Sequence, residues 1–255
     1  MADEKTVHLK IRRQDGPLKP RYWQEFNVPY QPGMNVITCL EEIRKNPVTA
    51  QGKPVAPVVW ECSCLEEVCG ACSMRINGTP QQSCSALIDN IGRALTLEPI
   101  DTFPVVRDLI VDRDEMFRNL IRVKAWVPVD GTYDLGPGPR QVAKEQSWMY
   151  VLSRCMTCGC CTDACPQVND RHEFIGPAIL SQVRLFNAHP TGKMHSHERM
   201  DAIMGPGGIV ECGNAQNCVK VCPKEIPLTQ SISELGRDTL AYGIKRFFTK
   251  PDVEM

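Results

Sequence analysis

The sequence predicts an α+β protein: a small mixed sheet that carries a helix, followed by an almost entirely helical half. Three observations lead to this prediction. Apolar residues alternate through much of the first part of the chain, as they do in half-buried strands. Beyond about residue 105 their spacing becomes helical. Cysteines are gathered in separate runs, and the last two runs each end in Cys-Pro.

The predicted sheet comes from short alternating segments separated by turn residues. Val7, Leu9 and Ile11 share one face of the first segment. Strands are expected at residues 6–12, 25–30, 57–61, 72–76 and 94–100, and a helix at 34–46. Asn77-Gly78, directly after the fourth of these strands, is typical of a tight hairpin turn.

The second half is expected to begin where the period changes. Residues 104–126 have helical spacing, so domains are predicted at 1–105 and 106–255. The Pro/Gly-rich segment 127–141 is expected to connect elements over the surface. Residues 147–155 and 176–190 are predicted as further helices.

Composition limits the functional classes. Lys and Arg number 29 against 30 Asp and Glu, which argues against nucleic-acid binding through bulk charge. The opening "MADEKTVHLK" does not resemble a secretory signal, and no run of about 18 apolar residues predicts a membrane span. A soluble, cytosolic chain that reaches a membrane only through a partner is expected. In such a reducing compartment, the 14 cysteines are expected to be metal ligands rather than disulfides.

The first cysteine run predicts a [2Fe–2S] cluster. Its spacing, "CLEEVCGAC" with a fourth cysteine further on, is the plant-type pattern C-x4-C-x2-C…C. The predicted ligands are Cys64, Cys69, Cys72 and Cys84. Gly70 would let the backbone pass close to the cluster. A four-cysteine zinc site fits this spacing less well, and Cys62 stays open as an alternative to Cys64.

The second run, "CMTCGCCTDACP", predicts a [4Fe–4S] cluster. Cys155, Cys158 and Cys161 can surround three corners of a cubane. In two-cluster ferredoxins the fourth cysteine of such a run binds the other cluster. The fourth ligand is therefore expected to be Cys222, from the related run "CGNAQNCVKVCP".

The third site is expected to hold one iron fewer. Cys165, Cys212 and Cys218 remain for it, and in the last run Ala215 stands at the position of the second cysteine, which Cys158 occupies in the preceding run. Three thiolates and an alanine suit a [3Fe–4S] cluster. Cys39, Cys62 and Cys160 are left as packed thiols.

No substrate-transforming site is predicted. His195 and His197 are expected in a solvated loop, because two close histidines lack a third metal ligand. No Ser/His/Asp arrangement, phosphate loop or dinucleotide fingerprint is visible, and residues 205–208 are expected to form a turn. The residues therefore predict a protein that transfers electrons.

With the segments "CLEEVCGAC" and "GPAILSQVRLF", this order of clusters closely resembles the iron–sulfur subunits of succinate dehydrogenase and its fumarate reductase relatives. The resemblance implies an N-terminal β-grasp ferredoxin domain and a C-terminal α-helical ferredoxin domain. It implies a partner flavoprotein with FAD, a membrane-anchor cytochrome b and a quinone, at the cytoplasmic face of the membrane. The family works in the tricarboxylic acid cycle and the respiratory chain.

One departure from the family pattern concerns the quinone. Many ubiquinone-linked members have a Trp and a His where this sequence has Asp170 and Gly213. The departure predicts a dihaem anchor and menaquinone. The fumarate reductase direction stays open, since potentials and substrate supply decide it. A heterodisulfide-reductase-like subunit and a zinc-stabilised interaction protein fit the cysteine spacings less well.

Overall fold

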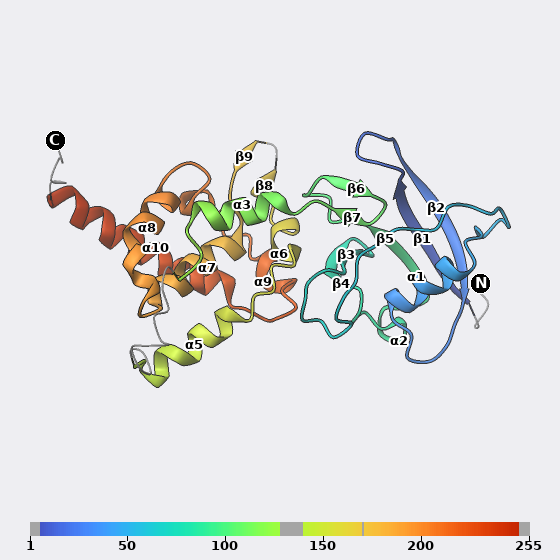
Figure 1. Cartoon of the computed structure of the whole chain (residues 1–255), viewed down its shortest axis with the longest axis horizontal. Coiled ribbons are helices and arrows are strands. Elements are labelled where there is room, and N and C mark those ends of the chain that lie inside the picture. Colours follow the sequence, from blue (N-terminus) through green and yellow to red (C-terminus); the bar gives the residue numbers. More distant parts are fainter. Residues whose placement is uncertain (1–5, 128–139, 170, 250–255) are drawn as a thin grey trace, which may run out of the picture. The chain divides into compact units, whose positions relative to one another are not determined.

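The computed structural model describes residues 6–127, 140–169 and 171–249. The chain divides into two compact units, shown with their elements in Figure 1. The first comprises Met1–Asp114, Met156–Ala164 and Val221–Pro223, and the second comprises Glu115–Cys155, Cys165–Lys220 and Lys224–Met255. Most of the predicted surface connection at 127–141 lies outside the described residues, and the domain boundary at 105 stays a prediction.

The first unit is built on a five-stranded mixed sheet in the order β2-β1-β5-β3-β4. The strands are β1 (Thr6–Gln14), β2 (Arg21–Pro29), β3 (Ser73–Ile76), β4 (Thr79–Gln82) and β5 (Ala94–Glu98). β1 pairs antiparallel with β2 and parallel with β5. Ile76 opposes Thr79 across the Asn77-Gly78 turn, so the predicted hairpin is confirmed. Both turn residues have positive φ, 51° and 79°, as a type I′ turn requires.

The helix α1 (Val36–Lys45) contributes one apolar face to the core of this unit. Val7, Leu9 and Ile11 of β1 are fully buried, as their alternation predicts, and they belong to the same core cluster as Leu40. The Asn35 side chain caps α1 by accepting a hydrogen bond from the Thr38 amide at 2.9 Å. A short helix, α2 (Ile88–Ile91), precedes β5.

The prediction of a helix from residue 104 is wrong for its first part. Residues 105–111 form a hairpin of β6 (Val105–Arg107) and β7 (Ile110–Val111), and α3 (Asp114–Arg122) begins only afterwards. Asp108 turns the hairpin with φ 47° and its buried carboxylate accepts two hydrogen bonds from Arg13, at 2.9 and 3.1 Å. This long-range ion pair fixes the turn, and the local pattern of apolar residues gives no sign of it.

The strand predicted at 57–61 is also absent, because these residues bond to Arg13 and to the 105–111 hairpin instead of to a strand of the main sheet. Arg13 Nη2 donates to the Pro57 carbonyl at 3.2 Å. The Val59 amide donates to Asp108 at 3.0 Å, and the Val59 carbonyl accepts from the Leu109 amide at 3.1 Å. The backbone polar groups are therefore satisfied without a regular ladder.

The second unit is helical, with one small exception. Its longer helices are α3, α5 (Ala143–Ser153), α7 (Pro177–Ala188), α8 (Ser196–Met204) and α10 (Leu228–Phe248), with short turns at η1 (Gly192–His195), η2 (Ile209–Glu211) and α9 (Asn217–Lys220). α7 packs against both α5 and α10. The exception is a two-stranded ribbon of β8 (Val168–Asn169) and β9 (His172–Glu173). Within the described ranges, no helix combines the length and hydropathy needed to cross a membrane.

His195 and His197 do not lie in a solvated loop, so that expectation is wrong. His195 ends η1 and its ring contacts Glu198, while His197 lies in α8 with its ring edge-on to Tyr242, 5.2 Å between centroids. Both rings therefore have partners from helical elements. Residues 205–208 form the expected turn.

Candidate iron–sulfur cluster sites

The loop that carries the first cysteine run folds around the Cys64 sulfur. Backbone amides of Glu66, Val68 and Cys69 donate to Cys64 Sγ at 3.4, 3.3 and 3.4 Å. These hydrogen bonds lower the pKa of the Cys64 thiol to about 6. Leu65 and Glu67 have φ of 59° and 57°, the conformation that turns successive amides toward one point. Such a cradle of donors fits a thiolate that binds iron.

Two more predicted ligands of this site, Cys72 and Cys84, flank the hairpin of β3 and β4. Cys84 lies in a turn two residues beyond the end of β4, not on the strand itself. Burial, with Cys84 close by, raises the pKa of Cys72 to about 12. Cys72 Sγ donates to Gln82 Oε1 at 3.4 Å, and the side-chain Nδ2 of Asn35 donates to the Cys84 carbonyl at 2.9 Å. Residues of β4 and of the start of α1 thus hold these two cysteines in position.

Gly70 is the point where the first cysteine loop meets the second. It has φ +74°, and an added Cβ would lie 2.8 Å from the Met156 carbonyl oxygen and 2.9 Å from Cys158 Cβ. Both values are below ordinary contact distance. Only a glycine lets the two loops approach this closely.

Gly70→Ala is therefore expected to reduce cluster incorporation and to destabilise the first unit by about 1–3 kcal/mol. Gly78→Ala is the matched control. Gly78 also has positive φ, +79°, but an added Cβ there would have nothing within 4 Å. Iron and acid-labile sulfide content and the melting temperature measure the difference. Equal losses in the two variants would show that the backbone conformation matters and the loop contact does not.

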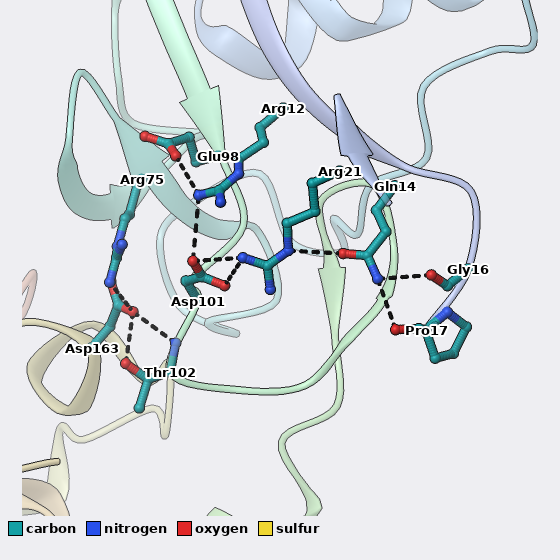
Figure 2. A network of polar contacts seen from close by, with 10 residues as sticks. All are labelled: Arg12, Gln14, Gly16, Pro17, Arg21, Arg75, Glu98, Asp101, Thr102 and Asp163. Carbon is teal, nitrogen blue, oxygen red and sulfur yellow. Dashed lines mark hydrogen bonds and ion pairs between the residues drawn. The ribbon is translucent and has the colours of Figure 1, made fainter. Parts of the chain in front are cut away.

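The second loop is anchored to the same unit by Asp163, at the end of α6 (Cys160–Asp163). Arg75 of β3 donates to both carboxylate oxygens at 2.7 and 2.9 Å, and Thr102 donates to Oδ1 from its amide and its hydroxyl (Figure 2). Gly159, with φ +85°, packs on the Phe103 ring. Sequence reasoning missed this anchor, because Arg75 and Thr102 are far from Asp163 in the chain.

Cys160 supports its neighbour Cys158. It is fully buried, and a hydrogen bond from its thiol lowers the pKa of Cys158 to about 7, with the positive charge of Arg113 acting in the same direction. Gln82 Nε2 lies 3.5 Å from Cys160 Sγ. Cys39 is a fully buried thiol in the core of the first unit, as expected, whereas Cys62 is exposed, so the expectation of a packed thiol is wrong for Cys62.

Three predicted ligands of the third site line one cavity in the second unit. Cys165, Cys212 and Cys218 surround it together with Ala215, Gln167 and Thr229. Burial, with the charges of Cys165 and Cys212 nearby, raises the pKa of Cys218 to about 11. Ala215 contributes no donor atom to this cavity.

The two units separate the cysteines of the last two runs. Cys158, Cys161 and Cys222 belong to the first unit, whereas Cys165, Cys212 and Cys218 belong to the second. Cys155 belongs to the second unit and is the last residue of its Glu115–Cys155 segment. Among the residues that the structure describes, no three His, Cys, Asp or Glu side chains converge on a single metal ion. A cluster distributes its thiolates over several irons, so its ligands need not converge on one point.

Backbone amides that donate to the Cys64 sulfur in the mixed-sheet unit, and a cavity lined by three cysteines in the helical unit, indicate an iron–sulfur protein with more than one cluster. Residues 8–118 match the model of a 2Fe-2S iron-sulfur cluster binding domain, and residues 151–226 match that of a 4Fe-4S dicluster domain. The succinate dehydrogenase iron-sulfur subunit of Bacillus subtilis (strain 168) is 57% identical, over 97% of this chain and 98% of its own length. The chain belongs to the family of succinate dehydrogenase iron–sulfur subunits.

More distant relatives include the fumarate reductase iron-sulfur subunit of Wolinella succinogenes, 29% identical over 90% of this chain and 94% of its own length. Among solved structures, a chain of the Mycobacterium smegmatis Sdh1 complex in the apo form has the same fold. The TM-score is 0.79 at 20% identity, covering 97% of this chain and 99% of that one.

The expected class of function is confirmed: the protein is the electron-transfer subunit of an oxidoreductase complex. Its cofactors are the [2Fe–2S], [4Fe–4S] and [3Fe–4S] clusters, and its partners are a flavoprotein subunit and a membrane anchor.

Proposed function

We propose a specific ligand set for each cluster. Cys64, Cys69, Cys72 and Cys84 hold the [2Fe–2S] cluster, Cys155, Cys158, Cys161 and Cys222 hold the [4Fe–4S] cluster, and Cys165, Cys212 and Cys218 hold the [3Fe–4S] cluster. These residues would hold the clusters, which would supply the one-electron transfers from the FAD of the flavoprotein toward cytochrome b and quinone. In the first of these sites, the backbone amides of Glu66, Val68 and Cys69 donate to the Cys64 sulfur.

The observation that carries this assignment is the cavity shared by Cys165, Cys212, Cys218 and Ala215. It supports a site with three thiolates and no fourth ligand. The first unit supports the other two sites, because Cys64 lies in a cradle of amide donors and Gly70 brings the Cys158 loop beside the first one. The work of this chain is to fix these thiolates and exclude competing ligands.

We also propose that the subunit lies at the cytoplasmic face of the membrane and serves a dihaem anchor and menaquinone. The proposal rests on Asp170, which lies outside the described residues, and on Gly213. An added Cβ at Gly213 would lie 2.5 Å from the side-chain nitrogen Nε2 of Gln167, so the Gln167 side chain occupies the space that a side chain at position 213 would need. This arrangement supports a third site without a histidine beside it.

Low-temperature EPR on the anaerobically purified complex tests the assignment. The oxidised protein is expected to show a [3Fe–4S] signal that disappears on reduction, when [2Fe–2S] and [4Fe–4S] signals replace it. A second [4Fe–4S] signal in place of [3Fe–4S] would contradict the role of Ala215. Haem and quinone extracted from the same sample test the anchor, and a haem-free complex with ubiquinone would count against it.

A further inference from the structure

Arg113 lies where the first two cysteine loops meet. It directly precedes α3, and its Nη2 donates to the Ala71 carbonyl at 3.0 Å. Ala71 follows Gly70, where an added Cβ would lie only 2.9 Å from Cys158 Cβ. The Arg113 guanidinium therefore reaches the backbone junction between the proposed [2Fe–2S] loop and the Met156–Ala164 part of the proposed [4Fe–4S] loop, both in the first unit.

The Arg113 charge is only weakly compensated. Its side chain is 15% exposed, and its paired carboxylate, Glu61 Oε2, lies 3.8 Å from Nη1 on a side chain that is 44% exposed. A pair with so much solvent around one partner contributes little. Buried Asp108 and Asp163, by contrast, are each fully engaged by other arginines.

One donor of this guanidinium has no partner. The Nε–H of Arg113 is buried, and no acceptor for it exists among the residues that the structure describes. A buried donor left unsatisfied costs about 1–3 kcal/mol, so such groups are rare in folded proteins. The sulfur of an adjacent cluster is an acceptor that would satisfy it.

We propose that Arg113 is an electrostatic positioning residue that raises the reduction potentials of the [2Fe–2S] and [4Fe–4S] clusters together. Reduction adds one electron to each cluster and neither makes nor breaks a bond. A nearby cation and a hydrogen bond to sulfur both stabilise the more negative, reduced state. The inference rests on the ligand assignment proposed above.

The test is a potentiometric EPR titration of the intact complex with Arg113→Gln, Arg113→Lys and Arg107→Gln. Arg107 lines the same groove as Arg113, is exposed, and supplies a matched loss of one positive charge. In Arg113→Gln, the [2Fe–2S] and [4Fe–4S] potentials are expected to become more negative. The [3Fe–4S] potential, from cysteines in the other unit, is expected to stay at its wild-type value.

Unchanged potentials in Arg113→Gln, or shifts no larger than those in Arg107→Gln, would overturn the inference. If Arg113→Gln fails to retain its clusters, Arg113→Lys decides. Lysine keeps the charge but cannot provide the Nε donor, so a negative shift of both potentials from their wild-type values supports the inference and wild-type potentials refute it. The assignment of ligands is judged separately, by whether the wild-type complex shows all three signals.

Discussion

Asp108→Asn is expected to lower the free energy of unfolding by about 3–5 kcal/mol, the usual cost of leaving a buried charge without its partner. Asp108 and Arg13 have side chains that are 0% and 1% exposed. Each carboxylate oxygen accepts two hydrogen bonds: Oδ1 from Arg13 Nε and the Gln14 amide, and Oδ2 from Arg13 Nη2 and the Val59 amide. Whichever way an asparagine is turned, its NH2 group must face two donors.

Thermal melting of the complex measures this effect, and asparagine is chosen because it tolerates the positive φ of this turn. Glu42→Gln, which breaks an exposed pair with Lys45, is the control and should change stability by less than about 0.5 kcal/mol. The double variant Arg13→Gln/Asp108→Asn should recover part of the loss, because it removes the uncompensated charge. A single variant that melts like the control would contradict the expected role of this pair.

The same ion pair shows why sequence reasoning succeeded for part of the first unit and failed for the rest. The alternation in residues 6–12 and the Asn77-Gly78 turn are local signals, and both gave the correct elements. The segments 57–61 and 105–111 were wrongly predicted. Their conformation depends on Arg13, which lies more than forty residues away in sequence.

The candidate cluster sites show a similar division. Spacing alone indicated the cysteines, because a short loop must supply several thiolates to one cluster. Spacing could not reveal the groups that hold these loops: Arg75 acts on Asp163, and Gln82 reaches Cys160 from the sheet. These contacts join residues roughly eighty apart, and only the fold brings them together.

Cys222→Ser is expected to abolish the [4Fe–4S] EPR signal while the [3Fe–4S] signal persists. A serine hydroxyl is a poor substitute for a thiolate at an iron–sulfur cluster, so the site that loses its cysteine loses its cluster. Simple reading along the chain would assign Cys222 to the same cluster as Cys212 and Cys218. The structure instead puts Cys222 in the first unit with Cys158 and Cys161, which supports the crossed arrangement.

Cys218→Ser is the reciprocal variant, because Cys218 lines the cavity of the third site in the second unit. It should lose the [3Fe–4S] signal and keep [4Fe–4S]. Cys62→Ser, at an exposed cysteine outside the proposed sets, should keep all three signals, and loss of [2Fe–2S] there would favour Cys62 over Cys64 as a ligand. If Cys222→Ser removed [3Fe–4S] and spared [4Fe–4S], each run would serve its own cluster. The exchange of fourth cysteines between the two runs would then be wrong, although three thiolates would still surround the cavity at Ala215.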